Sequence, residues 1–271
     1  MKRTLTSTLA ALAITSLAAS PALAKSVVFT DPVGDDNGPG TYTYPTDAVY
    51  LPGSFDLTEF KVEEKGSDLE FSVSVNSRLA DPWGMGVGFA VQMVFIFIDT
   101  EADGGYTDSL PGLNVQFADD SAWNKVVVLS PQQQSRVIAE ARVKVADKLA
   151  AGDLVVPRRT TGRGKTISAR VKKSEIGAGD IGSWGYQVVM QSNEGFPDRA
   201  DFLTRKVNEY EGQHRFGGGD DGDCDPHVMD VLAGSGTGAA EEVALQHEML
   251  SYECGPDGES IRKATLRMVR K

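Results

Sequence analysis

Apolar and polar residues alternate strictly between residues 69 and 75. The apolar positions are Leu69, Phe71, Val73 and Val75, and every residue between them is polar. Because successive side chains of a strand point to opposite faces, this pattern predicts a strand with one buried and one solvated face. An apolar-rich segment precedes it at residues 54–63, and Gly66-Ser67-Asp68 supplies a turn between the two. The two segments are therefore expected to form a hairpin.

The most apolar segment runs from Val91 to Ile98 and consists almost entirely of β-branched and aromatic residues. Such a segment predicts a strand that is covered on both faces. Further short strand candidates, separated by Gly, Pro and Asp turns, are residues 113–117, 125–129, 137–145, 166–171 and 184–190. Only Glu140–Leu149 and Glu241–Leu250 compete as helices, and the first overlaps a strand candidate. Many short strands between such turns predict a mainly β chain folded as an antiparallel, immunoglobulin-like β-sandwich.

The composition changes from Phe196 onward. A tract rich in Gly and Asp covers residues 217–225, and a second glycine-rich stretch covers residues 234–238. We expect residues 25–195 to form the sandwich and residues 196–271 to form an extension that folds back on it.

The chain has two cysteines, Cys224 and Cys254, and both lie in this extension. Two cysteines in an exported chain usually pair, and closing a loop of this length stabilises the fold by about 3 kcal/mol. A metal site that combines the cysteines with His227 and His247 is the alternative.

The N-terminal residues have the pattern of a secretory signal peptide. Its parts are Lys2 and Arg3, an apolar run from Leu5 to Leu17, and small residues at Ala22 and Ala24. We expect residues 1–24 to be removed and the chain to reach the periplasm or the extracellular medium. The apolar run is shorter than a membrane span, and no later segment reaches that length.

Net charge limits the choice of partners. The signal segment holds two of the 27 basic residues and none of the 38 acidic ones, so 25 basic residues face 38 acidic residues after its removal. The resulting charge of −13 disfavours nucleic acid and anionic lipid as partners. It suits divalent cations and neutral glycans.

The stretch from Asp31 to Asp47 predicts neither a helix nor a regular strand. Its prolines and glycines break both patterns, while its carboxylates and Asn37 gather oxygen ligands in one loop. Such a loop suits a hard cation, a sugar or both. We expect Asp35, Asp36 and Asn37 to contribute to a Ca²⁺ site, and a solvated acidic turn is the alternative.

A stronger candidate Ca²⁺ loop follows the apolar strand. Residues 99–108 place oxygen ligands at spaced positions among glycines, namely Asp99, Glu101, Asp103 and Asp108. The loop lacks the ligand order of an EF-hand. A third acidic set comprises Asp220, Asp221, Asp223 and Asp225. Each set has the same alternative, a hydrated loop without an ion.

Aromatic residues in or beside the loops are candidates for sugar contact, because flat rings pack on the C–H faces of pyranoses. The four that we expect to bind carbohydrate are Tyr42, Tyr44, Trp83 and Tyr106. Packing against their own loops is the alternative, and Tyr42 and Tyr44 would then hold the acidic loop on the sandwich.

Haem and catalysis have weaker support. No C-x-x-C-H motif is present, which excludes covalently attached haem. The three histidines, His214, His227 and His247, all lie outside the predicted sandwich, which disfavours a pocket for non-covalent haem. Nucleophile-elbow and zinc-protease motifs are also missing. A glycoside hydrolase needs only two carboxylates and stays as an alternative, although no pair can be named.

Several blocks together resemble the C-terminal domain of glucodextranase and its relatives, a DOMON-like β-sandwich family. The blocks are residues 31–47, Phe55–Phe60, Pro82–Gly84 with Gly88–Phe89, Gly217–Asp220, and Asp225–Asp230. The resemblance implies a carbohydrate-binding or cell-surface-attachment module, not a catalyst.

We therefore expect an exported binding module for a polysaccharide or cell-envelope glycan, with loops ordered by Ca²⁺. An interaction subunit of a cell-surface assembly, with an envelope or secreted protein as its partner, is one alternative. A b-type haem electron carrier is the other.

Overall fold

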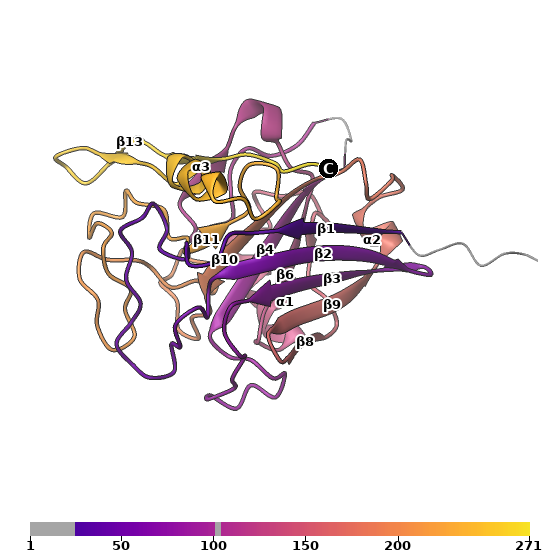
Figure 1. Ribbon diagram of the computed structural model, residues 1–271, viewed down its shortest axis with the longest axis horizontal. Helices are drawn as coiled ribbons and strands as arrows, with labels where there is room; N and C mark the ends of the chain where they lie inside the picture. The colour runs from indigo at the N-terminus through magenta and orange to yellow at the C-terminus, as the bar shows by residue number, and fades with distance from the viewer. Residues whose placement is uncertain (1–24, 101–103) are drawn as a thin grey trace, which may run out of the picture.

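The computed structural model describes residues 25–100 and 104–271. The predicted signal peptide, residues 1–24, lies outside these ranges. Two five-stranded sheets pack face to face (Figure 1). The predicted β-sandwich is confirmed.

The first sheet has the strand order β1 (Ser26–Thr30), β2 (Leu57–Lys65), β3 (Asp68–Val75), β9 (Thr166–Lys172), β8 (Thr160–Arg163). The second sheet has the order β11 (Asp230–Val231), β10 (Gly185–Ser192), β4 (Gln92–Asp99), β6 (Lys125–Leu129), β7 (Leu154–Val155). Neighbouring strands in these sheets are antiparallel except β6 and β7.

The alternating segment is β3, and its apolar positions are buried while its polar positions are partly exposed. It forms the predicted hairpin with β2, in which Phe60 pairs with Val73 and Lys65 pairs with Asp68. Gly66 occupies the turn at a positive φ of 67°, a conformation that costs glycine little. The hairpin therefore places the apolar face of both strands against the second sheet.

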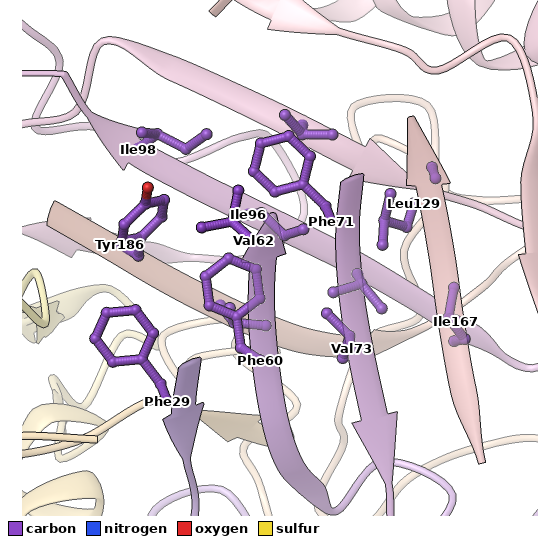
Figure 2. Close-up of a cluster of buried hydrophobic side chains, with 14 of the residues drawn as sticks. Phe29, Phe60, Val62, Phe71, Val73, Ile96, Ile98, Leu129, Ile167 and Tyr186 are labelled. Carbon is purple, nitrogen blue, oxygen red and sulfur yellow. The ribbon is translucent and has the colours of Figure 1, made fainter. Parts of the chain in front are cut away.

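The main core lies between the two sheets (Figure 2). Phe29 and Phe60 of the first sheet contact the ring of Tyr186 in the second, with ring centroids 5.6 Å and 5.4 Å away. Ile96 and Leu129 fill the same layer. These contacts hold the sheets in one relative position.

Strand β4 is buried on both faces, as predicted. Ile96 and Ile98 face the main core, whereas Phe95 and Phe97 belong to a second apolar cluster on the outer face of the sheet. Much of that cluster comes from the C-terminal extension, which contributes Phe202, Leu203, Val228, Val231, Leu250, Ala264 and Leu266. The extension is therefore part of the fold's packing, since it covers one face of the second sheet.

The smaller elements surround the sheets. They are β5 (Val115–Phe117), η1 (Asp119–Ser121), α1 (Gln134–Lys144), α2 (Lys173–Ile176), α3 (Glu241–Met249), β12 (Glu253–Cys254), β13 (Ser260–Arg262) and β14 (Ala264–Leu266). Strand β14 of the extension pairs in parallel with β5.

The strand candidate at residues 137–145 is wrong, because α1 occupies most of it. Glu140 forms ion pairs one turn away in each direction, with Arg136 and Lys144, which favours helix. The helix also begins earlier than the predicted start at Glu140. The second predicted helix is confirmed as α3.

Cys224 and Cys254 form the predicted disulfide, with their Cα atoms 5.6 Å apart. Both sulfur atoms are therefore unavailable to a metal. Within the described ranges, no helix is long and apolar enough to cross a membrane.

Replacing both cysteines by serine should lower the free energy of unfolding by about 2–4 kcal/mol, because the 30-residue separation no longer restricts the unfolded chain. Urea denaturation of the parent and the double variant measures the difference. Equal midpoints would show that the bridge contributes no stability.

Candidate functional site

Four aspartates meet where the two sheets and the extension adjoin. Asp31 follows β1 and Asp56 precedes β2. Both lie at the same end of this strand pair, because Thr30 pairs with Glu59. Asp230 begins β11 in the other sheet, yet its carboxylate accepts a hydrogen bond from the Leu57 N–H at 2.7 Å. Asp35 lies in the acidic loop between β1 and β2. The cluster therefore joins both sheets and that loop.

The acidic loop is also tied to the extension by Gln246 of α3. The Gln246 amide donates to the Asp35 carbonyl at 2.5 Å and accepts from the Val231 N–H at 3.0 Å. This fully buried side chain fixes Asp35 relative to β11.

The four carboxylates are almost completely buried. The exposed fractions are 3% for Asp31, 2% for Asp35, 1% for Asp56 and 0% for Asp230. One oxygen from each of Asp31, Asp35 and Asp230 lies within 4.8 Å of the other two. Such a gathering of like charges away from water requires protonation or a positively charged partner.

Several of these oxygens accept no hydrogen bond from an N–H or hydroxyl group of the described residues, although the Asp31 and Asp230 carboxyl groups can share a proton with each other. They are both carboxylate oxygens of Asp31, both of Asp35, Oδ1 of Asp56 and Oδ1 of Asp230. The other oxygen of two residues does accept hydrogen bonds. Oδ2 of Asp230 accepts from the Leu57 N–H, and Oδ2 of Asp56 accepts from the Gly34 N–H and the Asn76 amide.

Burial shifts the protonation of the whole cluster. Burial and the charges of Asp35 and Glu242 raise the pKa of Asp31 to about 9. Burial, with the nearby Asp56 and Asp36, raises the pKa of Asp35 to about 7. The pKa of Asp230 is also raised well above its ordinary value, by burial and then by Asp31.

Glu242 is a buried carboxylate whose oxygens are hydrogen-bonded within the protein, and it serves as a comparison for the aspartate cluster. Its exposed fraction is 2%, and its two oxygens accept hydrogen bonds from Ser235, Thr237, Gly238 and Ala239. Burial alone would raise the pKa of Glu242, but these bonds lower it. The aspartate cluster lacks any comparable set of donors.

The predicted ligands Asp35, Asp36 and Asn37 have three different sets of neighbours. Asp35 joins the buried cluster, whereas Asp36 accepts a hydrogen bond from the Tyr44 hydroxyl. Oδ1 of Asn37 lies 3.3 Å from a ring nitrogen of His247.

The second predicted set, at residues 99–108, is only partly described. Asp99 forms an ion pair with Arg270, and the Asp108 side chain lines a cleft, while Glu101 and Asp103 lie outside the described residues. In the third set, Asp223 pairs with Lys206, and Asp221 accepts from the Glu209 N–H.

Tyr42 and Tyr44 hold the acidic loop in place. Tyr42 is 5% exposed, and its hydroxyl donates to the Pro226 carbonyl at 2.6 Å. The ring of Tyr44 packs edge-on against Phe55, with centroids 5.2 Å apart. Tyr42 therefore does not present its ring to an external ligand in this structure.

Trp83 and Tyr106 are placed differently from that pair. Trp83 is 38% exposed and makes an edge contact with Tyr50. Tyr106 packs on Trp123 with centroids 4.8 Å apart, and its hydroxyl donates to Asp153 at 2.7 Å. Tyr106 lines a cleft whose lining does not include Trp83.

The cleft has a volume of about 740 Å³. It lies between the segment 105–115 and residues of the extension. Polar and charged side chains dominate its walls, among them Asp108, Asn114, Lys148, Asp201, Lys206 and Lys263. A cleft of this size and polarity can hold a ligand rich in hydroxyl groups.

The histidines occupy three separate surroundings. Nδ1 of His227 accepts from the Val207 N–H at 3.2 Å, and the ring lines the polar cleft. His214 lies beside Tyr50, and His247 lies against Gly40 and Asn37.

Sequence reasoning missed Asp56 and Asp230 as members of the cluster and did not single out Asp31. Each lies beside a strand, in a segment that resembles the glucodextranase C-terminal family. A carboxylate next to an apolar strand was therefore the signal present in the sequence. Which of these carboxylates come together, however, depends on how distant strands pair.

Together these features define a disulfide-linked β-sandwich domain with a polar cleft and a buried acidic cluster. Residues 27–268 match the family described as the C-terminal binding-module, SLH-like, of glucodextranase. The chain belongs to this family, as the resemblance implied. None of the curated proteins matches it.

The metal-free protein should become less stable as the pH rises from 5 to 8. Asp31 and Asp35 bind protons more tightly in the folded than in the unfolded chain, so their contribution is full below an unfolded pKa of about 4 and is lost as the pH approaches 7 to 9. The loss approaches about 1.4 kcal/mol per pH unit for each carboxyl that stays protonated only in the folded state. Urea denaturation in chelator at several pH values measures it, and stability that increases over this range would contradict the assignment.

Proposed function

We propose that this chain is an exported, non-catalytic module that binds a polysaccharide or a cell-envelope glycan. The observation that carries the proposal is the polar cleft of about 740 Å³ in a chain of a binding-module family. The family description names glucodextranase, which points first to glucans as ligands.

The lining of the cleft supports carbohydrate as the ligand class. Asp108 and Thr107 are exposed on one wall, and Lys148 and Lys263 are exposed on others. Carboxylates accept hydrogen bonds from sugar hydroxyls, and ammonium groups donate to them. Tyr106 adds an aromatic surface to the same cleft.

Trp83 offers a second contact for a polymeric ligand. Its exposed ring stands on a loop that does not line the cleft. A chain of sugars that reaches both positions would gain affinity over a short oligosaccharide by linked binding.

The alternative is an interaction subunit of a cell-surface assembly that binds protein instead of glycan. Exposed apolar side chains at Phe196, Tyr210 and Ile261 favour it, since they lie on the extension and are 94%, 64% and 64% exposed. Binding assays with glycans decide between the two.

Asp108→Ala should weaken glycan binding about tenfold or more, because a hydrogen bond to a charged group contributes about 1.5–3 kcal/mol. Isothermal titration calorimetry with a panel of soluble α- and β-glucans and envelope polysaccharide identifies the ligand and measures the change. Asp147→Ala is the matched control, since it removes an exposed carboxylate that does not line the cleft. Equal affinities for the two variants would place the glycan elsewhere, and no binding by the parent would favour the assembly subunit.

Trp83→Ala should weaken binding of a long polysaccharide and leave binding of a short oligosaccharide unchanged. The free energy of unfolding should change by less than about 1 kcal/mol, because the side chain is partly exposed. Affinity electrophoresis and thermal unfolding measure the two effects. A large loss of stability would instead assign Trp83 a packing role.

A further inference from the structure

The buried aspartate cluster has the features of a cation site, and it lies apart from the cleft. Asp31, Asp35 and Asp230 do not line the cleft. Their nearest oxygens lie within 4.8 Å of one another, which is about the distance between two oxygens on opposite sides of one Ca²⁺ ion at 2.3–2.6 Å from each. The spacing therefore admits one ion in contact with all three.

The oxygens available to such an ion are those that the protein leaves without a partner. Asp31 and Asp35 each have two unpartnered oxygens, and Asp230 has one, in side chains that are at most 3% exposed. A buried polar atom without a partner destabilises the fold, so native proteins rarely retain one without a compensating group. Three residues with such oxygens, each with one oxygen within 4.8 Å of the other two, point to a compensating cation.

Among the described residues, no basic side chain is one of the groups that act most strongly on Asp31, Asp35 and Asp230. The groups that act most strongly on Asp31 and Asp230 are acidic, namely Asp35, Asp56 and Glu242 for the first and Asp31, Asp35 and Asp56 for the second. In the described part of the chain, Lys165 acts on Asp56, but less strongly than burial and the charge of Asp36.

We propose that Asp31, Asp35 and Asp230, with Asp56 beside them, bind one Ca²⁺ ion that joins the acidic loop to both sheets. Oxygen ligands select a hard cation, and a site this deeply buried favours Ca²⁺ over Mg²⁺, which retains several of its waters. The ion is independent of the glycan, because its ligands lie outside the cleft. It differs from the loop at residues 99–108, where Asp99 already pairs with Arg270.

The structural consequence is a clamp. Asp31 directly follows β1 and Asp56 directly precedes β2, and these two strands pair in the first sheet. Asp230 begins the edge strand of the second sheet, and Asp35 belongs to the acidic loop. A bound ion would fix these three parts together, and with them Tyr42 and Tyr44. Removing it should loosen the loop and lower the melting temperature of the whole domain.

The test is thermal unfolding of the full chain after EGTA treatment, with Ca²⁺ or Mg²⁺ added back, and metal content by mass spectrometry. Ca²⁺ at about 100 times its dissociation constant should raise the melting temperature by roughly 5 °C or more, with one ion per chain, and Mg²⁺ should give less than half that shift. No shift with Ca²⁺, or an equal shift with Mg²⁺, would overturn the assignment.

Two variants locate the ion. Asp31→Asn should abolish the Ca²⁺ shift, because it removes one of the carboxylate ligands. Asp108→Asn is the matched control on the other acidic loop and should keep the full shift. The reverse pattern would place the ion at residues 99–108.

Asp56→Asn is the second variant in case Asp31→Asn does not fold. Its Oδ2 is already held by Gly34 and Asn76, so the fold tolerates an amide there, and the Ca²⁺ shift should be reduced. If every cluster variant that folds keeps the full Ca²⁺ shift, the ion does not bind at the cluster. The carboxyl groups would then be stabilised by shared protons, as between Asp31 and Asp230.

Discussion

Burial of like charges at one junction constrains the rest of this structure. The end of β1, the acidic loop and the edge strand β11 each place an aspartate in the same small volume, and Asp56 at the start of β2 acts electrostatically on all three. Charges in such a place must be neutralised, whether by protons or by a cation. The acidic loop, Tyr44 and helix α3 are linked to that neutralisation, because Tyr44 donates to Asp36 beside Asp35, and Gln246 of α3 donates to the Asp35 carbonyl.

The two apolar clusters hold in place the parts of the fold that meet at the aspartate cluster. The main core fixes the sheets against each other through Phe29, Phe60 and Tyr186, and the extension covers the outer face of the second sheet. The hydrogen bond from the Leu57 N–H to Asp230 holds β11 close to the first sheet, and the bond from Gln246 to the Asp35 carbonyl holds α3 close to the acidic loop. Asp230 is thereby carried to Asp31 across the sandwich. The cleft lies elsewhere, so the scaffold separates ligand binding from the charged junction.

The strands could be predicted because their signals are local. Alternation at residues 69–75 and the apolar segment at 91–98 specify strands whatever their partners are, and β3 and β4 follow them. Helix α1 was harder, since its apolar residues also fit a strand and only the ion pairs of Glu140 separate the two. The cluster could not be predicted, because Asp31 and Asp230 are far apart in sequence and only strand pairing brings them together. Likewise, Tyr42 stands in a glycine-rich loop that resembles an exposed binding surface, yet Asp225 and Pro226 of the extension cover it.

The most direct measurement is a crystal structure of the protein grown in Ca²⁺, with anomalous scattering data. The account predicts one anomalous peak among Asp31, Asp35 and Asp230, with carboxylate oxygens at about 2.3–2.6 Å from it. A map without a peak there, with the Asp31 and Asp230 carboxyl groups in direct hydrogen-bonded contact, would show that protons alone neutralise the junction and would contradict the account.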